Sequence, residues 1–293
     1  MRLVDCPIRI RLLAAVAALV AAVAAPAADA ASLWAPRDVR GLISLEMLRP
    51  SIEGLDAEVF SSAFYLSGRL AATPTVTFVA ELPYARMRGS APGYSYYPFA
   101  PDEYYPYPYS LPASGSTIGN PYVGFEAAIP GSPLFVEFGG RPPLASDREY
   151  DAEVMGAVAD LTRFFAFTEQ YASVQFGVNV YEVLPSKLAC RIRVSPLLAI
   201  PSESYLETEF FTFYSVQAGY QGRSARAGMG LAGMALLTEN YPSNLGQRTV
   251  TQLELHADFL SGRVRPGVDV HLPLGTLASS VPVVVGTGIT WAP

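Results

Sequence analysis

The sequence predicts an all-β protein, a transmembrane antiparallel up-and-down β-barrel of about twelve strands, within a range of ten to fourteen. Three observations predict this fold: a repeated alternation of apolar and polar residues, a secretory leader, and connections that alternate between short and long. An alternation of period two marks a strand with one apolar face. Many such strands behind a leader are typical of outer-membrane barrels, which have short periplasmic turns and long extracellular loops.

The clearest alternation runs through residues 171–183. Val174 and Phe176 fall on one face of this stretch, whereas Gln175 and Asn179 fall on the other. The stretches at 252–259 and 263–272 repeat the pattern. Because an Arg or Lys on the lipid face costs about 2–4 kcal/mol near the membrane midplane, we expect the polar face to line the lumen.

The polar faces of successive strands define a set of candidate lumen residues. The set comprises Glu81, Glu126, Glu137, Gln175, Asn179, Arg191, Arg193, Glu254, His256, Asp258, Arg265, Asp269 and His271. Because acidic and basic groups are mixed, two interpretations stay open, a closed interior of ion pairs and a solvated channel whose charges tune selectivity. Twelve strands lie between the filled barrels of about eight strands and the open barrels of about sixteen or more.

The N-terminus predicts export to the bacterial outer membrane. Residues 1–30 combine Arg2, Arg9 and Arg11 with an apolar stretch and a small-x-small cleavage site that ends at Ala30. This combination is typical of a signal peptide that is removed. We therefore expect residues 31–293 to form one barrel domain, with outer-membrane lipid and the barrel-assembly machinery as partners.

Turn residues and the alternation place the strands in order. Their expected ranges are 40–49, 56–71, 74–85, 117–129, 133–141, 171–184, 189–200, 210–221, 225–238, 248–260, 263–273 and 281–291. The long joins between them are expected at 86–116, 142–170, 201–209, 239–247 and 274–280. A two-residue turn at 261–262 would place Asp258 opposite Arg265, where the two side chains would form a cross-strand ion pair.

The long join at 86–116 contains a segment rich in tyrosine and proline, residues 89–112. Proline stiffens a chain, and tyrosine combines an apolar ring with a polar tip. Two roles stay open for this segment, the capture of apolar, aromatic or sugar solutes, and a rigid protective loop or interfacial aromatic belt. The candidate capture residues are Tyr94, Tyr96, Tyr97, Phe99, Tyr104, Tyr105, Tyr107 and Tyr109.

The long join at 142–170 has a helical pattern. Ser146 and Glu149 fit a capping box, and Val154, Val158 and Phe165 recur at helical spacing. Three positions stay open for this helix: over the barrel mouth, folded inward as a partial plug, or on the surface, packed on loops.

Chemistry that depends on charge, metals or nucleophiles has little support. The net charge of −6 gives no electrostatic support for nucleic-acid binding. Beyond the leader Cys190 is the single cysteine, and no side chains show ligand spacing, so neither a metal nor another cofactor is expected. A hydrolase would have to combine His256 or His271 with Ser195 or Ser215, and the sequence has no G-x-S-x-G elbow. We expect the protein not to be an enzyme.

One hairpin resembles that of a known group of proteins. The segment 117–126 contains Gly119-Asn120-Pro121, and the segment 135–143 follows after a turn. The pair resembles the G-N/D-P-x-x-G hairpin of outer-membrane proteins grouped with the phenol-degradation meta-pathway family, which are similar to long-chain fatty-acid transporter barrels. The chain departs from this pattern because Ala292-Pro293 follow the last aromatic residue and no N-terminal plug precedes the first strand.

The resemblance implies a monomeric barrel that passes small hydrophobic or aromatic compounds. The expected function is therefore an outer-membrane channel or transporter for passive passage of such solutes. The alternatives are a closed structural or adhesive barrel that acts through its extracellular loops, an outer-membrane hydrolase, and a soluble secreted β-sandwich.

Overall fold

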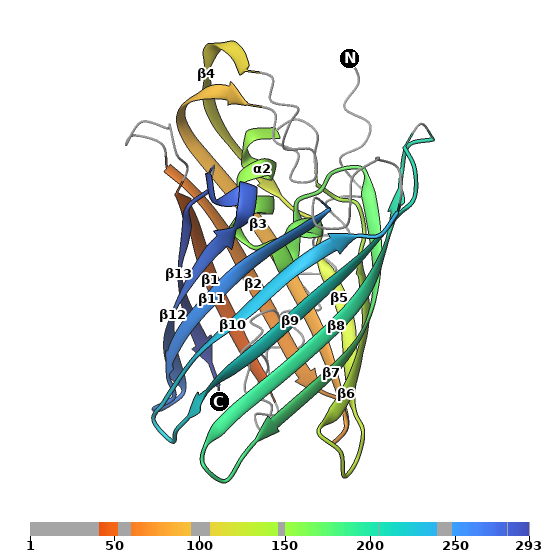
Figure 1. The fold of residues 1–293 in the computed structure, drawn as a ribbon, viewed down its shortest axis with the longest axis vertical. Coiled ribbons are helices and arrows are strands. Elements are labelled where there is room, and N and C mark those ends of the chain that lie inside the picture. Colours follow the sequence, from red (N-terminus) through yellow and green to blue (C-terminus); the bar gives the residue numbers. More distant parts are fainter. Residues whose placement is uncertain are drawn as a thin grey trace.

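The computed structural model describes residues 41–51, 60–94, 106–145, 150–204, 206–238, 248–279 and 281–292. These residues form a closed antiparallel β-barrel of tilted strands around a short helical segment (Figure 1). The predicted signal peptide, residues 1–30, lies outside the described residues. The first strands are β1 (Gly41–Ser51), β2 (Phe60–Ala71), β3 (Val76–Tyr94), β4 (Pro106–Ile118), β5 (Tyr122–Ala128) and β6 (Leu134–Arg141). The others are β7 (Tyr171–Val183), β8 (Leu188–Pro201), β9 (Glu209–Gln221), β10 (Ala225–Leu236), β11 (Thr249–Phe259), β12 (Val264–Leu274) and β13 (Val283–Trp291).

Thirteen strands occupy twelve positions around the barrel, because β4 and β5 share one position. β3 pairs with β5 along its first part, where Glu81 opposes Tyr122, and with β4 along its second part, where Tyr84 opposes Ile118. β1 pairs with both β2 and β13 and closes the sheet. The predicted twelve-stranded barrel is confirmed, but the predicted single strand at 117–129 is wrong because the chain leaves the sheet at 119–121.

The predicted loop at 86–116 is also wrong in its extent. β3 continues to Tyr94 and β4 begins at Pro106, and the two strands pair as a hairpin with a register shift between Pro92 and Gly93. The proline content predicted a loop because proline cannot donate a ladder hydrogen bond. β4 lies at the end of the sheet order, and an edge strand tolerates this loss.

The alternation of the sequence appears as two faces of the barrel wall. Apolar side chains such as Phe176, Ile192 and Val216 are 48%, 49% and 58% exposed on the outward face. Polar side chains such as Gln217 and Glu254 are 2% and 3% exposed on the inward face. The outer apolar band is the surface that such a barrel presents to lipid.

Short and long connections lie at opposite ends of the barrel (Figure 1). The short turns cover 72–75, 129–133, 184–187, 222–224 and 260–263. Gly131 and Gly262 have φ of +74° and +84°, a conformation that glycine adopts without steric strain. The predicted alternation of short periplasmic turns and long extracellular connections is confirmed.

The hairpin of β11 and β12 differs from its predicted register by two residues. Asp258 opposes Gly267 and His256 opposes Asp269, because the turn at 260–263 is longer than the predicted pair 261–262. A shift of two keeps every side chain on its face. The predicted ion pair of Asp258 with Arg265 is nevertheless wrong, and Arg226 on β10 binds Asp258 instead at 2.6 Å.

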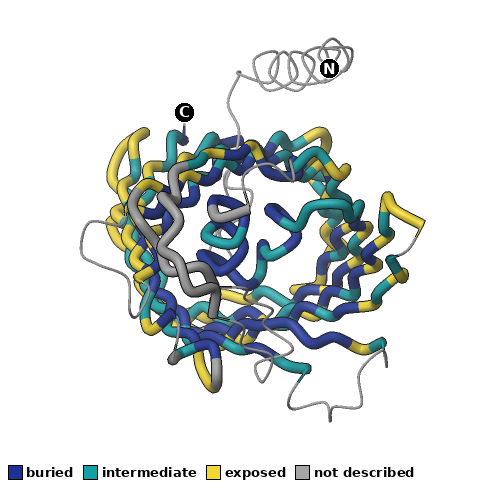
Figure 2. The backbone as a smooth tube through the Cα atoms, turned by 90° about the horizontal axis from the view of Figure 1, so that it is seen from above, coloured by how far each residue is buried: buried dark blue, intermediate teal, exposed yellow. Residues whose placement is uncertain are grey.

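The helical segment lies inside the barrel. It consists of α2 (Tyr150–Ala159) and the 3-10 helix η1 (Leu161–Ala166), and the view along the barrel in Figure 2 shows it within the ring of strands. Of the positions that the sequence left open, the structure has the inward one. The predicted capping box of Ser146 and Glu149 lies outside the described residues. No helix in the described ranges has the length and apolar character needed to cross a membrane.

Candidate functional site

The candidate functional site is the barrel interior, which the helical segment α2–η1, here called the plug, divides into two parts. Toward the end with long connections, the plug packs in an apolar core with the wall. The ring centre of Phe165 lies 4.9 Å from that of Phe211 and 6.4 Å from that of Phe213. Phe167, just after the plug, meets the ring of Tyr65 edge-on at 6.0 Å. These aromatic side chains pack in what we call the apolar core.

Asn120 fastens the end of the plug to the wall at the point where β4 gives way to β5. Its side-chain amide donates to the carbonyl oxygens of Phe165 and Thr168, at 3.1 and 2.6 Å. Its side-chain oxygen accepts from the backbone N–H groups of Leu144 and Ala145, at 2.6 and 2.8 Å. The side chain is fully buried, so one asparagine satisfies four backbone groups that would otherwise lack partners.

Gly119 precedes Asn120 for a steric reason. A Cβ at this position would overlap the carbonyl oxygen of Ala166 and the ring of Phe167. The hairpin motif noted in the sequence therefore marks the joint at which the barrel wall receives the plug.

Arg163 holds the plug electrostatically. Its guanidinium lies 2.7 Å from the Glu46 carboxylate of β1 and 3.4 Å from the carboxylates of Glu81 on β3 and Asp160 on the plug itself. The guanidinium also lies 4.1 Å from the ring centre of Tyr65. Arg163 is 4% exposed, so these partners compensate for the removal of its charge from water.

Asp160 begins η1 and stays ionised beside Arg163. Its carboxylate accepts from the backbone N–H and the hydroxyl of Thr162, at 2.8 and 2.7 Å. Burial alone would raise the pKa of Asp160, yet the Arg163 guanidinium and the Thr162 hydrogen bonds hold that pKa below its ordinary value. The plug thus contributes both members of an internal ion pair.

A second network surrounds Glu137 on β6, nearer the short turns. Its carboxylate accepts from Arg193 at 2.7 Å, Ser195 at 2.9 Å, Gln175 at 3.1 Å and Asn179 at 3.2 Å. The partners come from β7 and β8, so the network crosses three neighbouring strands.

Other inward charges are paired in the same way. Arg69 forms an ion pair with Glu126, and the guanidinium of Arg141 lies 2.6 Å from Glu81. His256 Nε2 lies 3.6 Å from the carboxylate of Asp258, which also binds Arg226. The lumen wall therefore carries ion pairs that join groups of both signs on different strands.

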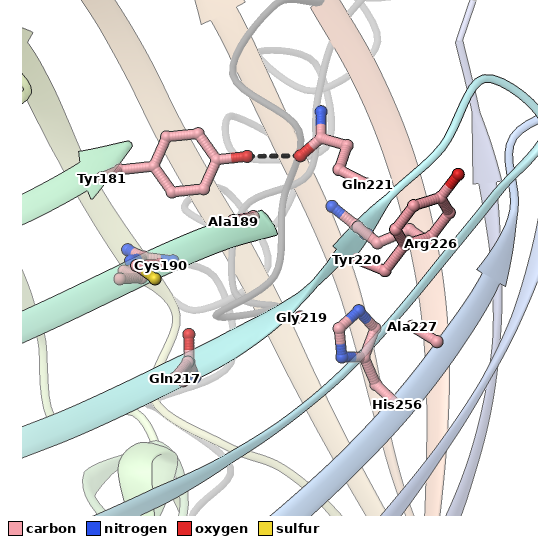
Figure 3. A pocket seen from close by; sticks show the side chains of 11 residues that line it. Tyr181, Ala189, Cys190, Gln217, Gly219, Tyr220, Gln221, Arg226, Ala227 and His256 are labelled. Carbon is pink, nitrogen blue, oxygen red and sulfur yellow. Dashed lines mark hydrogen bonds between the residues drawn. The ribbon is translucent and has the colours of Figure 1, made fainter. Parts of the chain in front are cut away.

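A pocket opens on the inner wall of β7 to β11, on the side of the short turns (Figure 3). Tyr181 donates to Gln221 at its rim, at 2.6 Å. Arg191, Arg226 and His256 contribute polar groups to the lining. Gly219 lies between them, and since it has no side chain the backbone forms the wall of the pocket there. A larger residue would not fit, because its Cβ would overlap the backbone of Ala227 and Gly228.

The structure places every predicted lumen residue on an inward face of the barrel. Glu81, Glu137, Asn179, Arg191, Glu254, His256 and His271 are buried, and Glu126, Gln175, Arg193, Asp258, Arg265 and Asp269 are partly buried. Glu254 accepts from Gln252 at 2.7 Å and faces His271 across the ladder. Whether these side chains line a path for solutes stays a prediction.

Only part of the predicted tyrosine-rich site is described. Tyr96, Tyr97, Phe99, Tyr104 and Tyr105 lie outside the described residues. Tyr94 ends β3, and Tyr107 and Tyr109 belong to β4, so their backbone forms the tip of a hairpin that begins at the barrel wall. Their role in capture stays a prediction.

The residues weighed for hydrolysis do not converge. The ladder places Ser215 in line with Gln252, four positions from His256, or about 13 Å along the strand. Ser195 is in line with Val250, about 20 Å from His256, and donates to Glu137. Within the described ranges, no group of three or more His, Cys, Asp or Glu side chains could hold a metal ion.

Sequence reasoning missed Arg163 and Tyr65 as parts of the site. The helical spacing of Val154, Val158 and Phe165 identified the apolar side of the plug, and Arg163 does not belong to that side. The structure buries that face as well, because the plug is surrounded by wall. The available signal was that Arg163 is the single basic residue of 150–166, a segment that also contains three acidic residues.

The fold and its interior define an outer-membrane β-barrel with an internal plug. No protein-family profile matches the chain, and no curated protein matches it in sequence. Among solved structures, it is similar to an outer-membrane channel from Pseudomonas putida F1, at 10% identity over 90% of this chain and 99% of that one, with a TM-score of 0.56. At this identity the likeness shows the fold alone.

Two further similarities are weaker. The toluene transporter TodX of P. putida is 8% identical over 88% of this chain and 89% of its own, with a TM-score of 0.41. LpxR from Salmonella typhimurium is 9% identical over 85% of this chain and 99% of its own, with a TM-score of 0.45. The resemblance to the phenol-degradation meta-pathway family stays a prediction.

Proposed function

We propose that the protein is an outer-membrane channel for the passive passage of small hydrophobic or aromatic solutes, and that the plug closes it at rest. The observation that carries this proposal is the apolar core between the plug and the wall, which movement of the plug would open to a solute. The side chains that would line this opening, Tyr65, Phe165, Phe167, Phe211 and Phe213, are buried and aromatic. Binding sites for apolar small molecules have such linings, with a few polar groups that orient the ligand.

The interrupted wall supports movement of the plug. β6 pairs with β5 and ends at Arg141, so it does not extend alongside β4. In the described sheet, β4 therefore pairs with β3 alone. α2 packs against β3 and β4 from inside. A shift of α2 would thus open space beside β4 without breaking ladder hydrogen bonds between strands.

The polar lumen supports passage of neutral solutes rather than selection of ions. Arg193 with Glu137, Arg226 with Asp258, and Arg69 with Glu126 are compensated on the wall itself. A solute that leaves the opened apolar core would meet a polar wall on which these charges are paired. Capture at the outer end is assigned to the tyrosine-rich segment 89–112.

The test is the initial rate of uptake of radiolabelled toluene by cells that express the protein. We expect faster uptake than in cells with an empty vector, and slower uptake when a cross-link joins the plug to the wall. Uptake equal to that of the empty-vector cells, with the folded protein present in the outer membrane, would contradict the proposal.

A closed structural barrel is the second candidate, and the burial of Arg163 between Glu46 and Glu81 favours it. A buried ion pair that fixes the plug permanently would leave no path. This candidate predicts no solute uptake and no conductance in any variant that weakens the plug. We expect the protein not to be an enzyme. Neither the native protein nor the variant His256→Ala should therefore show esterase or phospholipase activity.

A further inference from the structure

Three arginines lie on the outward face of neighbouring strands, at the end of the barrel with long connections. They are Arg49 on β1, and Arg86 and Arg88 on β3, and all three are exposed. No ion pair joins any of them to a carboxylate within the described ranges, in contrast to the inward Arg69, Arg141 and Arg226, which pair with Glu126, Glu81 and Asp258. Among the described residues, the outward face thus carries three positive charges with no carboxylate partner.

The sheet register brings these arginines together. Arg86 opposes Ser62 on β2 and Ser116 on β4, and Arg88 opposes Phe60. Leu48 opposes Ala63, so the next residue, Arg49, lies beside Ser62 on its other side. Strands are about 4.8 Å apart, so the Cα atoms of Arg49 and Arg86 are separated by about 10 Å, a gap that two arginine side chains can span toward one group.

The row below the arginines is aromatic. Phe64 opposes Tyr84, and their ring centres are 5.9 Å apart. The guanidinium of Arg49 also lies 5.0 Å from the ring centre of Phe60. Aromatic girdles mark the membrane interfaces of such barrels, so the arginines lie at the level of the lipid headgroups.

The height of the arginines agrees with this placement. Phe78 lies near the other end of β3, is 53% exposed and is outward-facing. Arg86 follows Phe78 by eight residues on the same strand. In a strand tilted by about 40°, eight residues span about 20 Å along the barrel axis, which is close to the height of the apolar band, about 25 Å. Arg86 and Arg88 therefore lie at the extracellular edge of the band.

We infer that Arg49, Arg86 and Arg88 bind the phosphate groups of a phosphorylated glycolipid in the outer leaflet of the membrane. A guanidinium donates two parallel hydrogen bonds to a phosphate, and it is less strongly hydrated than an ammonium group. The exposed hydroxyl of Ser116 can donate to the same phosphate. This site concerns the lipid around the barrel, so it does not depend on the proposed passage of solutes.

The test is native mass spectrometry of the detergent-purified barrel with a bisphosphorylated, acylated glucosamine disaccharide (lipid A) as the probe. In the triple variant Arg49→Gln, Arg86→Gln and Arg88→Gln, we expect the lipid affinity to fall by at least about tenfold. The matched control is Lys187→Gln, Arg223→Gln and Arg263→Gln, which removes three exposed charges at the short turns. The control should keep the affinity of the native protein.

Two further arms identify the source of the phosphate. The same lipid without its phosphates should bind the native protein as weakly as the intact lipid binds the triple variant. Inorganic phosphate at millimolar concentration should compete only weakly. Equal binding of the dephosphorylated lipid, an unchanged affinity of the folded triple variant, an equal loss in the control, or full displacement by free phosphate would each overturn the inference.

Discussion

The guanidinium of Arg163 on the plug lies 2.7 Å from the carboxylate of Glu46 on β1, a residue 117 positions earlier in the chain. The same guanidinium reaches Glu81 on β3 and the ring of Tyr65 on β2. One side chain therefore connects the plug to three consecutive strands of the wall. This connection explains how a short helical segment stays fixed inside a barrel.

Replacing Arg163 by glutamine should weaken the protein and loosen the plug. The change leaves the buried Asp160 and the partly buried Glu46 without their cation, and removal of one partner of a buried ion pair costs about 3–5 kcal/mol. We expect the free energy of unfolding, measured by denaturant titration in detergent, to fall by this amount. Arg263→Gln, at an exposed turn, is the control, and an equal loss there would contradict the role of Arg163.

Asn120→Ala should release the end of the plug while the barrel stays closed. The variant loses hydrogen bonds to the carbonyls of Phe165 and Thr168 and leaves buried groups unpaired, at a cost of about 1–3 kcal/mol. Hydrogen–deuterium exchange should become faster at 163–168 and stay slow in β8 and β9. Protection that is unchanged at 163–168 would show that the plug does not depend on this joint.

Gly139→Ala should destabilise the wall because Tyr122 lies across it. A Cβ at Gly139 would overlap the Tyr122 ring, which also covers Gly124. Overpacking of this kind costs about 1–3 kcal/mol, so the thermal midpoint should fall. Gly68→Ala is the matched control, since the nearest atom to its Cβ would be 4.0 Å away. Similar midpoints for the two variants would refute this packing.

Acid should weaken the plug through Asp160. Its pKa is depressed in the folded protein, because Arg163 and Thr162 outweigh the effect of burial. Its stabilising contribution is therefore fully present above the ordinary carboxyl value of about 4 and is lost as the pH falls through the folded value. Between neutral pH and a pH of about 3, the native protein should lose more stability than Asp160→Asn. Equal losses would exclude Asp160 as the responsible group.

Substitution of Tyr94, Tyr97 and Tyr105 by serine should slow the uptake of radiolabelled toluene if the segment 89–112 captures solutes. Serine removes the aromatic faces and keeps a hydroxyl at each position. Tyr220→Ser, an exposed tyrosine near the short turns, is the control. Uptake at the native rate in the triple variant would rule out capture by this segment and leave the channel itself untouched.

The strands were predictable because their signal is local. The membrane imposes one apolar face, so neighbours such as Val174 and Gln175 reveal their faces without knowledge of the remaining chain. The extent of the β3–β4 hairpin was not predictable, because Pro92 and Pro106 mark loops in most contexts and an edge strand tolerates them. The register of β11 and β12 depended on the length of one turn, and its misjudgement gave Asp258 the wrong partner.

The plug joints were not predictable because their partners are distant. The hairpin motif drew attention to Asn120, but its hydrogen bonds run to Leu144 and Thr168, which no periodicity connects to it. Arg163 likewise pairs with Glu46, which lies 117 residues earlier in the sequence. Such contacts depend on where the plug sits, and the helical pattern fitted the surface and the interior equally well.

Single-channel conductance in a planar bilayer tests most directly whether the barrel is a channel closed by its plug. The native protein should be closed for most of the recording, and Arg163→Gln should show stable open steps because the plug has lost its ion pairs. A variant that is folded, inserted and as silent as the native protein would contradict the account and favour a permanently closed barrel.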